Sequence, residues 1–91
     1  MILDWLPAAN DNRFEQLDYI AQDNPLAAIG QDEEIERQVN MLLQQPKMGR
    51  PGRLEGTREL VVSRTPFIVV YRLQTHRIEV IRLLHSSQQW P

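Results

Sequence analysis

The chain has 91 residues, with 10 lysines and arginines against 12 acids, a net charge of −2, 42% hydrophobic residues and no cysteine. This length supports one domain with a single small core, and the composition excludes disordered and fibrous classes. The lack of cysteine excludes disulfides, thiolate metal sites and a cysteine nucleophile. No apolar run approaches the length of a membrane span and the first residues do not resemble a signal peptide, so we expect a cytoplasmic protein that does not enter a membrane.

The first 22 residues predict a short strand and then a helix. Residues 2–6 have the alternating pattern of a strand. Pro7 pre-sets the backbone φ angle for a first helical turn, and residues 8–22 contain no further proline and no glycine, so we expect one helix there. Its expected buried stripe, set by helical spacing, consists of Phe14, Leu17 and either Ile20 or Ala21.

Residues 26–45 predict a second helix. Asn24 is a good N-cap, Pro25 suits the first helical position, and Pro46 ends the segment. The expected buried stripe is Ala28, Ile35, Val39 and Leu42. Gly30 weakens this helix by roughly 1 kcal/mol relative to Ala, and we interpret it as a site of close helix packing. The very short connection predicts an antiparallel helical hairpin.

The second half predicts a loop and then a sheet. Residues 46–56 hold three of the four glycines and two of the six prolines, a composition typical of an irregular loop. Three runs rich in β-branched and aromatic residues follow at 56–64, 66–73 and 77–85, which predicts a three-stranded antiparallel meander.

Alternation along the last run divides its side chains between two largely apolar faces. One face would carry Ile78, Val80, Arg82 and Leu84, and the other Glu79, Ile81, Leu83 and His85. Such a strand is typical of a central position or of cover on both sides. Laying the helical hairpin across one face of the meander buries both apolar surfaces, which predicts a single two-layer α+β domain over residues 1–91.

The two halves of the chain differ in charge. Residues 1–45 contain nine acids and two bases, a net charge of −7, and residues 46–91 contain eight bases and three acids, a net charge of +5. This asymmetry predicts that an anionic partner, either a nucleic acid or an acidic protein, contacts the second half. It does not choose between them.

Several arginines of the second half are candidates for such a contact. Arg50, Arg53 and Arg64 have no obvious local partner, whereas we expect Arg72 to pair across the sheet with Glu59 or Glu79. We expect Trp5 in the core, and Trp90 either packed back on the sheet or buried by a partner. The sequence has no zinc-ligand spacing, phosphate-binding glycine loop or nucleophile motif, so we expect neither a metal nor a cofactor.

Six segments resemble the small toxins of the RelE/ParE superfamily, the toxic half of bacterial type II toxin–antitoxin modules. They are W-L-P-A-A (5–9), Y-I-A-Q-D-N-P-L-A-A (19–28), P-K-M-G-R-P-G-R (46–53), G-T-R-E-L-V-V (56–62), P-F-I-V-V-Y-R (66–72) and V-I-R-L-L-H-S-S-Q-Q-W-P (80–91). Together they span nearly the whole chain. The resemblance implies a RelE/ParE-like two-layer fold and a toxin that a cognate antitoxin neutralises.

The superfamily divides by target. Members of the RelE branch cleave mRNA on the ribosome, whereas members of the ParE branch inhibit DNA gyrase without an established chemistry of their own. Many mRNA-cleaving relatives carry an arginine on the second meander strand where this chain has Ile68, and an alkyl group cannot neutralise a phosphorane. The chain is therefore most similar to the ParE branch, which implies growth inhibition through DNA gyrase. A ribosome-dependent mRNA endoribonuclease is the alternative.

The alternative would give catalytic roles to three residues. His85 would act as general acid or base, and Arg64 or Arg82 would stabilise the phosphate, while Arg50 and Arg53 would hold the RNA backbone. A structural role for His85 at the end of the sheet remains equally open. His76 is expected in an exposed turn.

In the non-catalytic hypothesis, the second half of the chain binds partner proteins. Its expected contact residues are Arg50, Arg53, Arg64, Arg82, His85 and Trp90. An antitoxin of this kind has a DNA-binding domain and a segment that folds on the toxin, so contact with operator DNA would be indirect. We expect that segment beside the helical hairpin, with acidic residues meeting the arginines.

Overall fold

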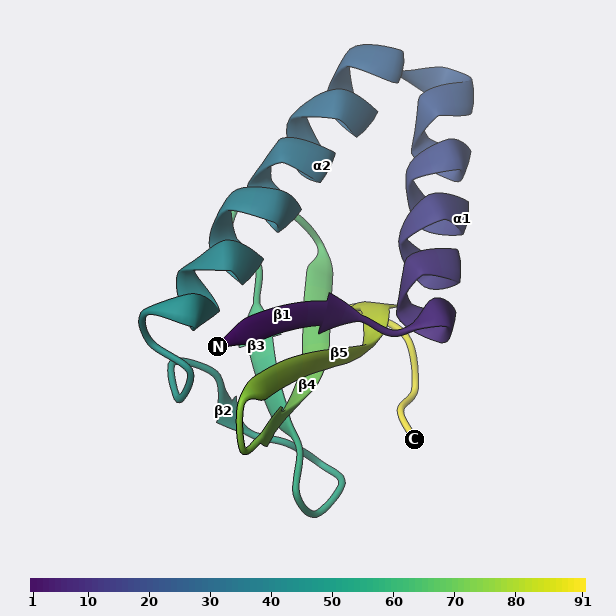
Figure 1. Cartoon of the computed structure of the whole chain (residues 1–91). Coiled ribbons are helices and arrows are strands. Elements are labelled where there is room, and N and C mark those ends of the chain that lie inside the picture. Colours follow the sequence, from purple (N-terminus) through teal and green to yellow (C-terminus); the bar gives the residue numbers. More distant parts are fainter.

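The fold is described from a computed structural model that covers residues 1–91. Two helices and five strands follow in the order β1, α1, α2, β2, β3, β4, β5 (Figure 1). Their bounds are β1 Ile2–Trp5, α1 Pro7–Asp23, α2 Pro25–Asn40, β2 Arg50–Pro51, β3 Arg58–Val61, β4 Phe67–Gln74 and β5 Arg77–His85, with a 3₁₀ turn at Met41–Leu43. The predicted strand, helical hairpin and meander are all present, and the α+β class is confirmed.

All five strands form one mixed sheet in the order β1-β5-β4-β3-β2. β3, β4 and β5 pair antiparallel as the predicted meander, and β1 pairs in parallel with the other side of β5. β5 therefore lies between β1 and β4, which confirms the position expected from its two apolar faces. The short β2 lies in the segment predicted to be an irregular loop. It was not predicted because a strand of two residues that ends in proline shows no alternating pattern.

One irregularity in the β4–β5 pairing decides which face the side chains of β5 occupy. Val70 pairs with Arg82 but Tyr71 pairs with Val80, so Ile81 is an extra residue and forms a β-bulge. From Arg82 onward, each side chain of β5 therefore lies on the face opposite to the one that strict alternation predicts. Arg82 consequently lies on the face opposite to Val80, and the grouping of these two side chains by strict alternation was wrong.

The helical hairpin covers one face of the sheet, the inner face, and builds the main core with it. The buried residues are Ala9, Ile35, Val39 and Leu42 from the helical segment and Leu60, Val62, Phe67, Val69, Tyr71, Ile78, Val80 and Leu83 from the sheet and its turns. All four residues of the stripe predicted for the second helix are buried. That prediction is confirmed.

The stripe predicted for the first helix is only partly right. Leu17 and Ile20 pack against the core, as does Trp5, but Phe14 is 76% exposed. The hairpin stands out from the sheet with its connection at the far end (Figure 1). Leu17 and Ile20 lie nearer that connection than Phe14 does, so Phe14 is exposed because of the side of α1 that it occupies and not because of its distance from the sheet. Neither helix has the length and apolar composition that a membrane crossing demands.

The opposite face of the sheet, the outer face, carries a second and smaller apolar cluster. Ile68, Val70 and Leu84 are buried there, and the partly buried Ile81 and Trp90 pack against them. The tail, residues 86–91, contains no helix or strand and brings Trp90 back onto the sheet. This is one of the two positions predicted for Trp90.

Local contacts fix the connections on both sides of α2. The Ala27 N–H donates to Asn24 Oδ1 at 3.1 Å, which confirms the N-cap. Beyond α2, Tyr71 Oη accepts from the Gly49 N–H at 2.9 Å and donates to the Pro46 carbonyl at 2.7 Å, which ties the loop to the sheet. A Cβ atom at position 49 would lie 2.6 Å from Tyr71 Oη, so only glycine fits.

Gly30 and Gly49 should respond in opposite ways to the same substitution. Gly30 is exposed, and a Cβ there would meet nothing within 4 Å, so the expectation of close helix packing at Gly30 was wrong. Gly30→Ala should raise the free energy of unfolding by roughly 0.5–1 kcal/mol, whereas Gly49→Ala should lower it because of the Tyr71 clash. Urea denaturation measures both, and a loss of stability in Gly30→Ala would contradict the open surroundings of that residue.

Candidate functional site

Most of the predicted site residues gather on the outer face of the sheet. Cross-strand pairing places Arg50 opposite Glu59, Glu59 opposite Val70, and Val70 opposite Arg82. Side chains that are paired directly across a sheet share a face. One row across four strands therefore carries a base, an acid, a buried aliphatic residue and a second base.

Glu59 is the buried acid of this row, with its side chain only 1% exposed. Its Oε1 accepts from Arg50 Nη2 at 3.1 Å and from Arg53 Nη2 at 3.2 Å, and its Oε2 accepts from Arg53 Nε and from the Arg53 backbone N–H, both at 3.0 Å. These hydrogen bonds, those of Arg53 above all, outweigh burial and lower the pKa of Glu59 to about 2. Glu59 is thus a fully engaged carboxylate that holds the β2 loop against the sheet.

The expectation that Arg50 and Arg53 lack local partners was wrong. The pairing of Arg50 with Glu59 could not be predicted because β2, which brings the two residues together, lies in a segment whose composition predicts a loop. Glu59 is bound by Arg50 and Arg53. Of the two acids predicted as partners of Arg72, the structure pairs it with Glu79, at 2.7 Å. This interaction lowers the pKa of Glu79.

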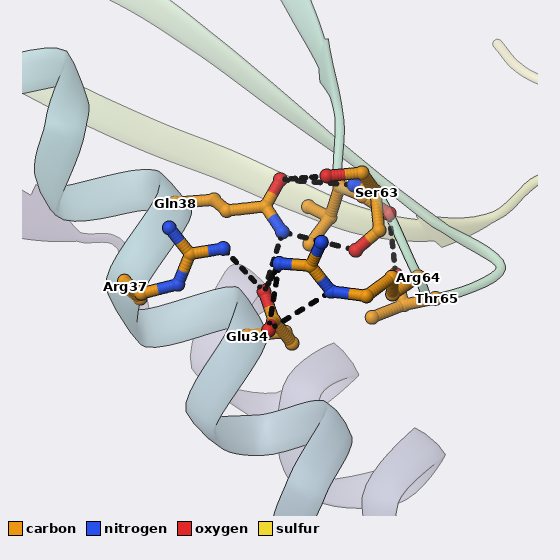
Figure 2. A network of polar contacts seen from close by, with 7 residues as sticks. Glu34, Arg37, Gln38, Ser63, Arg64 and Thr65 are labelled. Atoms are coloured by element: carbon orange, nitrogen blue, oxygen red, sulfur yellow. Dashed lines mark hydrogen bonds and ion pairs between the residues drawn. The ribbon is translucent and has the colours of Figure 1, made fainter.

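Arg64 is also paired, on the helical side of the molecule. It lies in the turn after β3 with a positive φ of 65°, and its guanidinium donates to both oxygens of Glu34 on α2, with Nη2 at 2.9 Å from Oε1 and 3.0 Å from Oε2 (Figure 2). Glu34 also accepts from Gln38 Nε2 and from Arg37 Nη2, each at 2.7 Å. Hydrogen bonds from Gln38, Arg37 and Arg64, in that order, lower the pKa of Glu34 to about 2.

Gln38 extends this network into the turn. It is buried, accepts from the Ser63 N–H at 2.9 Å and donates to the Ser63 carbonyl at 2.9 Å. The β3–β4 turn is therefore tied to α2 at two places, by Gln38 and by the Arg64–Glu34 pair (Figure 2). The expectation that Arg64 lacks a local partner was wrong, because its acid lies 30 positions earlier in the chain and only the folded hairpin brings it near.

Arg82 is the one predicted contact arginine without a carboxylate partner. Its Nη1 donates to the Ile81 carbonyl at 2.7 Å, and its guanidinium lies 5.9 Å from the centroid of the Trp90 ring. Arg53 Nη1 reaches the Trp90 carbonyl at 3.5 Å. Trp90 Nε1 is buried without a hydrogen-bond partner. Arg82 and Trp90 thus form a cation–π pair on the outer face.

His85 lies at the end of β5, where it holds the start of the tail. Its Nδ1 accepts from the Ser87 N–H at 3.1 Å, and its ring meets Phe67 edge to face at 6.1 Å between centroids. Acceptance at Nδ1 places the proton of the neutral ring on Nε2. Since Phe67 belongs to the inner core, His85 faces away from Arg82, and Arg64 is held on α2. The three candidate catalytic residues do not share a site.

A groove between the two helices is a feature that the sequence analysis missed. It has a volume of about 540 Å³. Its lining residues are Asn10, Arg13, Phe14, Leu17, Asp18, Ala21, Ala28, Ile29 and Asp32. Arg13 is neutralised there by Asp32 at 2.6 Å and Glu36 at 3.0 Å, so the groove has an apolar floor and an acidic rim. No signal in the sequence indicated it, because Phe14 fits the stripe that was expected to be buried.

Comparison with known proteins identifies the family. The model of the family described as ParE toxin of type II toxin-antitoxin system, parDE, matches residues 3–90. The chain belongs to the ParE toxin family. A relative from Sinorhizobium fredii (strain NBRC 101917 / NGR234), described as "Putative toxin Y4kP", is 41% identical over 73 residues, which cover 80% of this chain and 75% of the relative.

A solved structure agrees with this assignment of the chain to the ParE toxins. The structure described as "Chromosomal ParDE TA system from P. aeruginosa" aligns with a TM-score of 0.86 and 27% identity, covering 93% of this chain and 95% of that chain. The resemblance found in the sequence is thus confirmed for both fold and family. This ParE protein is the toxin of a parDE type II toxin–antitoxin system.

The Glu59 ion pairs predict a specific dependence of stability on pH. Because the pKa of Glu59 falls from its usual 4.5 to about 2 on folding, the stabilisation is complete above pH 4.5 and is lost as the pH falls toward 2. Glu59→Gln should lower the free energy of unfolding by roughly 2 kcal/mol at pH 7, less than for a fully buried pair because both guanidinium groups remain about half exposed. The difference from the unsubstituted protein should shrink as the pH falls.

Urea denaturation between pH 7 and pH 2 measures this difference. Glu55→Gln is the matched control, because Glu55 is an exposed acid in the same loop and makes no ion pair. It should behave like the unsubstituted protein throughout. A Glu59→Gln difference that stays constant over this pH range would show that the ion pairs do not set the stability of the loop.

Proposed function

We propose that this ParE toxin inhibits growth by binding DNA gyrase in the cytoplasm and does not act as an enzyme. The observation that supports this most is the separation of His85, Arg64 and Arg82 on different surfaces. A general acid or base needs the reacting group and a charge stabiliser within hydrogen-bond reach. His85 Nδ1 is instead engaged by Ser87, and Arg64 is engaged by Glu34.

A gyrase supercoiling assay and a translation extract separate the two candidate targets. The purified toxin should inhibit supercoiling and leave mRNA intact, and His85→Ala should inhibit supercoiling about as well as the unsubstituted toxin. Cleavage of mRNA that disappears in His85→Ala, with supercoiling unaffected, would instead establish the endoribonuclease alternative. Thermal denaturation of His85→Ala checks that any loss of effect is not a loss of folding.

We further propose that the cognate antitoxin neutralises the toxin by placing the apolar face of a helix in the groove between α1 and α2. Exposed Phe14 and Ile29 lie there over Leu17, Ala21 and Ala28, the geometry in which an amphipathic helix binds. The acidic rim favours basic residues at the edges of that helix. None of the arginines that we expected to meet an acidic antitoxin segment lines this groove, so they do not determine this contact.

Phe14→Glu should weaken antitoxin binding at least about tenfold, because it places a charge on the apolar floor of the groove. Tyr19→Glu is the matched control: Tyr19 lies on the same helix and is 74% exposed, against 76% for Phe14, but does not line the groove. Calorimetric titration of each variant with the antitoxin measures the effect. Equal weakening by both substitutions would place the antitoxin elsewhere.

A further inference from the structure

The outer face differs from the inner face in how it is covered. Its buried cluster, Ile68, Val70 and Leu84, has no helix above it, only Ile81 of the bulge and Trp90 of the tail. Val61, which pairs with Ile68 at the edge of this cluster, is 52% exposed. Apolar side chains thus continue from the covered cluster to the open surface, as they do in many protein-binding faces.

The acids of the outer face are all paired. Glu59 is bound by Arg50 and Arg53, Glu79 by Arg72, and Asp4 by Arg77. Glu59 has two arginines for one negative charge, and Arg82 has no acid at all. The face therefore has a surplus of positive charge on a chain whose net charge is −2.

Arg82 and Trp90 lie where this surplus meets the apolar cluster. The Arg82 guanidinium lies over the Trp90 ring at 5.9 Å from its centroid, and its only hydrogen bond is to the neighbouring Ile81 carbonyl. Trp90 Nε1 is a buried donor without an acceptor. Arg82 consequently holds unused hydrogen-bond donors beside apolar surface, and tryptophan and arginine are the residue types that dominate binding energy at protein interfaces.

We propose that the outer face, centred on Arg82 and Trp90 and flanked by Arg50 and Arg53, is the surface by which the toxin binds its target, and that the target contributes an acidic protein surface. This rests on the proposed function, in which the target is a protein. Carboxylates of the target pair with Arg82 and with the exposed sides of Arg50 and Arg53, while Trp90 and Val61 supply the apolar contact. The helical groove remains available to the antitoxin.

The arrangement of charges favours protein over nucleic acid. A phosphate backbone is bound by a continuous basic stripe. Here Glu59, Glu79 and Asp4 alternate with the arginines along the face, and the one arginine free of carboxylates stands alone on a tryptophan. This pattern fits separate carboxylates on a folded surface.

Arg82→Gln tests the proposal, with Arg77→Gln as its matched control. Both residues lie on β5, but Arg77 is at the far end of the strand, 49% exposed and paired with Asp4, outside the proposed contact. Arg82→Gln should reduce inhibition of gyrase supercoiling and of growth at least about tenfold, and Arg82→Lys should restore part of it. Arg77→Gln should act like the unsubstituted toxin. Antitoxin affinity and the melting temperature should be unchanged in all three variants.

Trp90→Ala gives a second test, and it should also lose target inhibition while it retains antitoxin binding. In a Trp5→Phe background, Trp90 is the sole tryptophan, so its emission should shift when gyrase is added. If Trp90→Ala fails to fold, the emission shift and Arg82→Gln decide the question alone.

The outcomes separate this inference from the proposed function. If the unsubstituted toxin inhibits gyrase and Arg82→Gln inhibits it equally, the outer face is not the target surface, and the proposed function stands. If the unsubstituted toxin leaves gyrase unaffected, the proposed function fails, and the inference is then tested by growth inhibition. Loss of growth inhibition in Arg82→Gln supports the outer face as the target surface. Retention of growth inhibition in Arg82→Gln overturns the inference. Binding of single-stranded RNA that Arg82→Gln abolishes would overturn the acidic protein partner.

Discussion

Strands β4 and β5 carry apolar side chains on both faces of the sheet. The rest of the structure follows from the need to shield each face from water. On the inner face the helical hairpin provides a continuous core. On the outer face only Ile81 and Trp90 provide cover. The first cover consists of regular helices with a stripe of buried side chains, and the second of one bulge residue and one residue of an irregular tail. The inner face is therefore structural, whereas the outer face remains partly open to a partner.

Charge is distributed in keeping with this division. A buried carboxylate without partners would be costly, and Glu59 is tolerated because Arg50 and Arg53 satisfy both of its oxygens. The same pairs join the β2 loop to the outer face and leave it positive. On the other side, the helices carry most of the acids of the chain, and the groove between them has an acidic rim. The toxin thus presents two surfaces of opposite charge.

The sequence predicted what depends on local periodicity. The stripe of α2, the Asn24 cap, the meander and the central position of β5 all follow from spacing and residue type along a few turns or one strand. The Ile81 bulge could not be predicted, because it depends on how β5 pairs with β4, and it moved Arg82 to the outer face. The partners of Arg50 and Arg64 were missed for a related reason: Glu59 comes close to Arg50 only through the pairing of β2 with β3, and Glu34 comes close to Arg64 only through the packing of distant segments. Phe14 was misplaced because it lies on the side of α1 that lines the groove between the helices and not on the side that faces the sheet.

Hydrogen–deuterium exchange on the toxin alone, with its antitoxin and with gyrase tests most directly whether the two surfaces have separate partners. We expect the antitoxin to slow exchange in the parts of α1 and α2 that line the groove, and gyrase to slow exchange in the β2 loop, the end of β5 and the tail around Trp90. Protection of the same segments by both proteins, or protection of the helices alone by gyrase, would contradict this expectation.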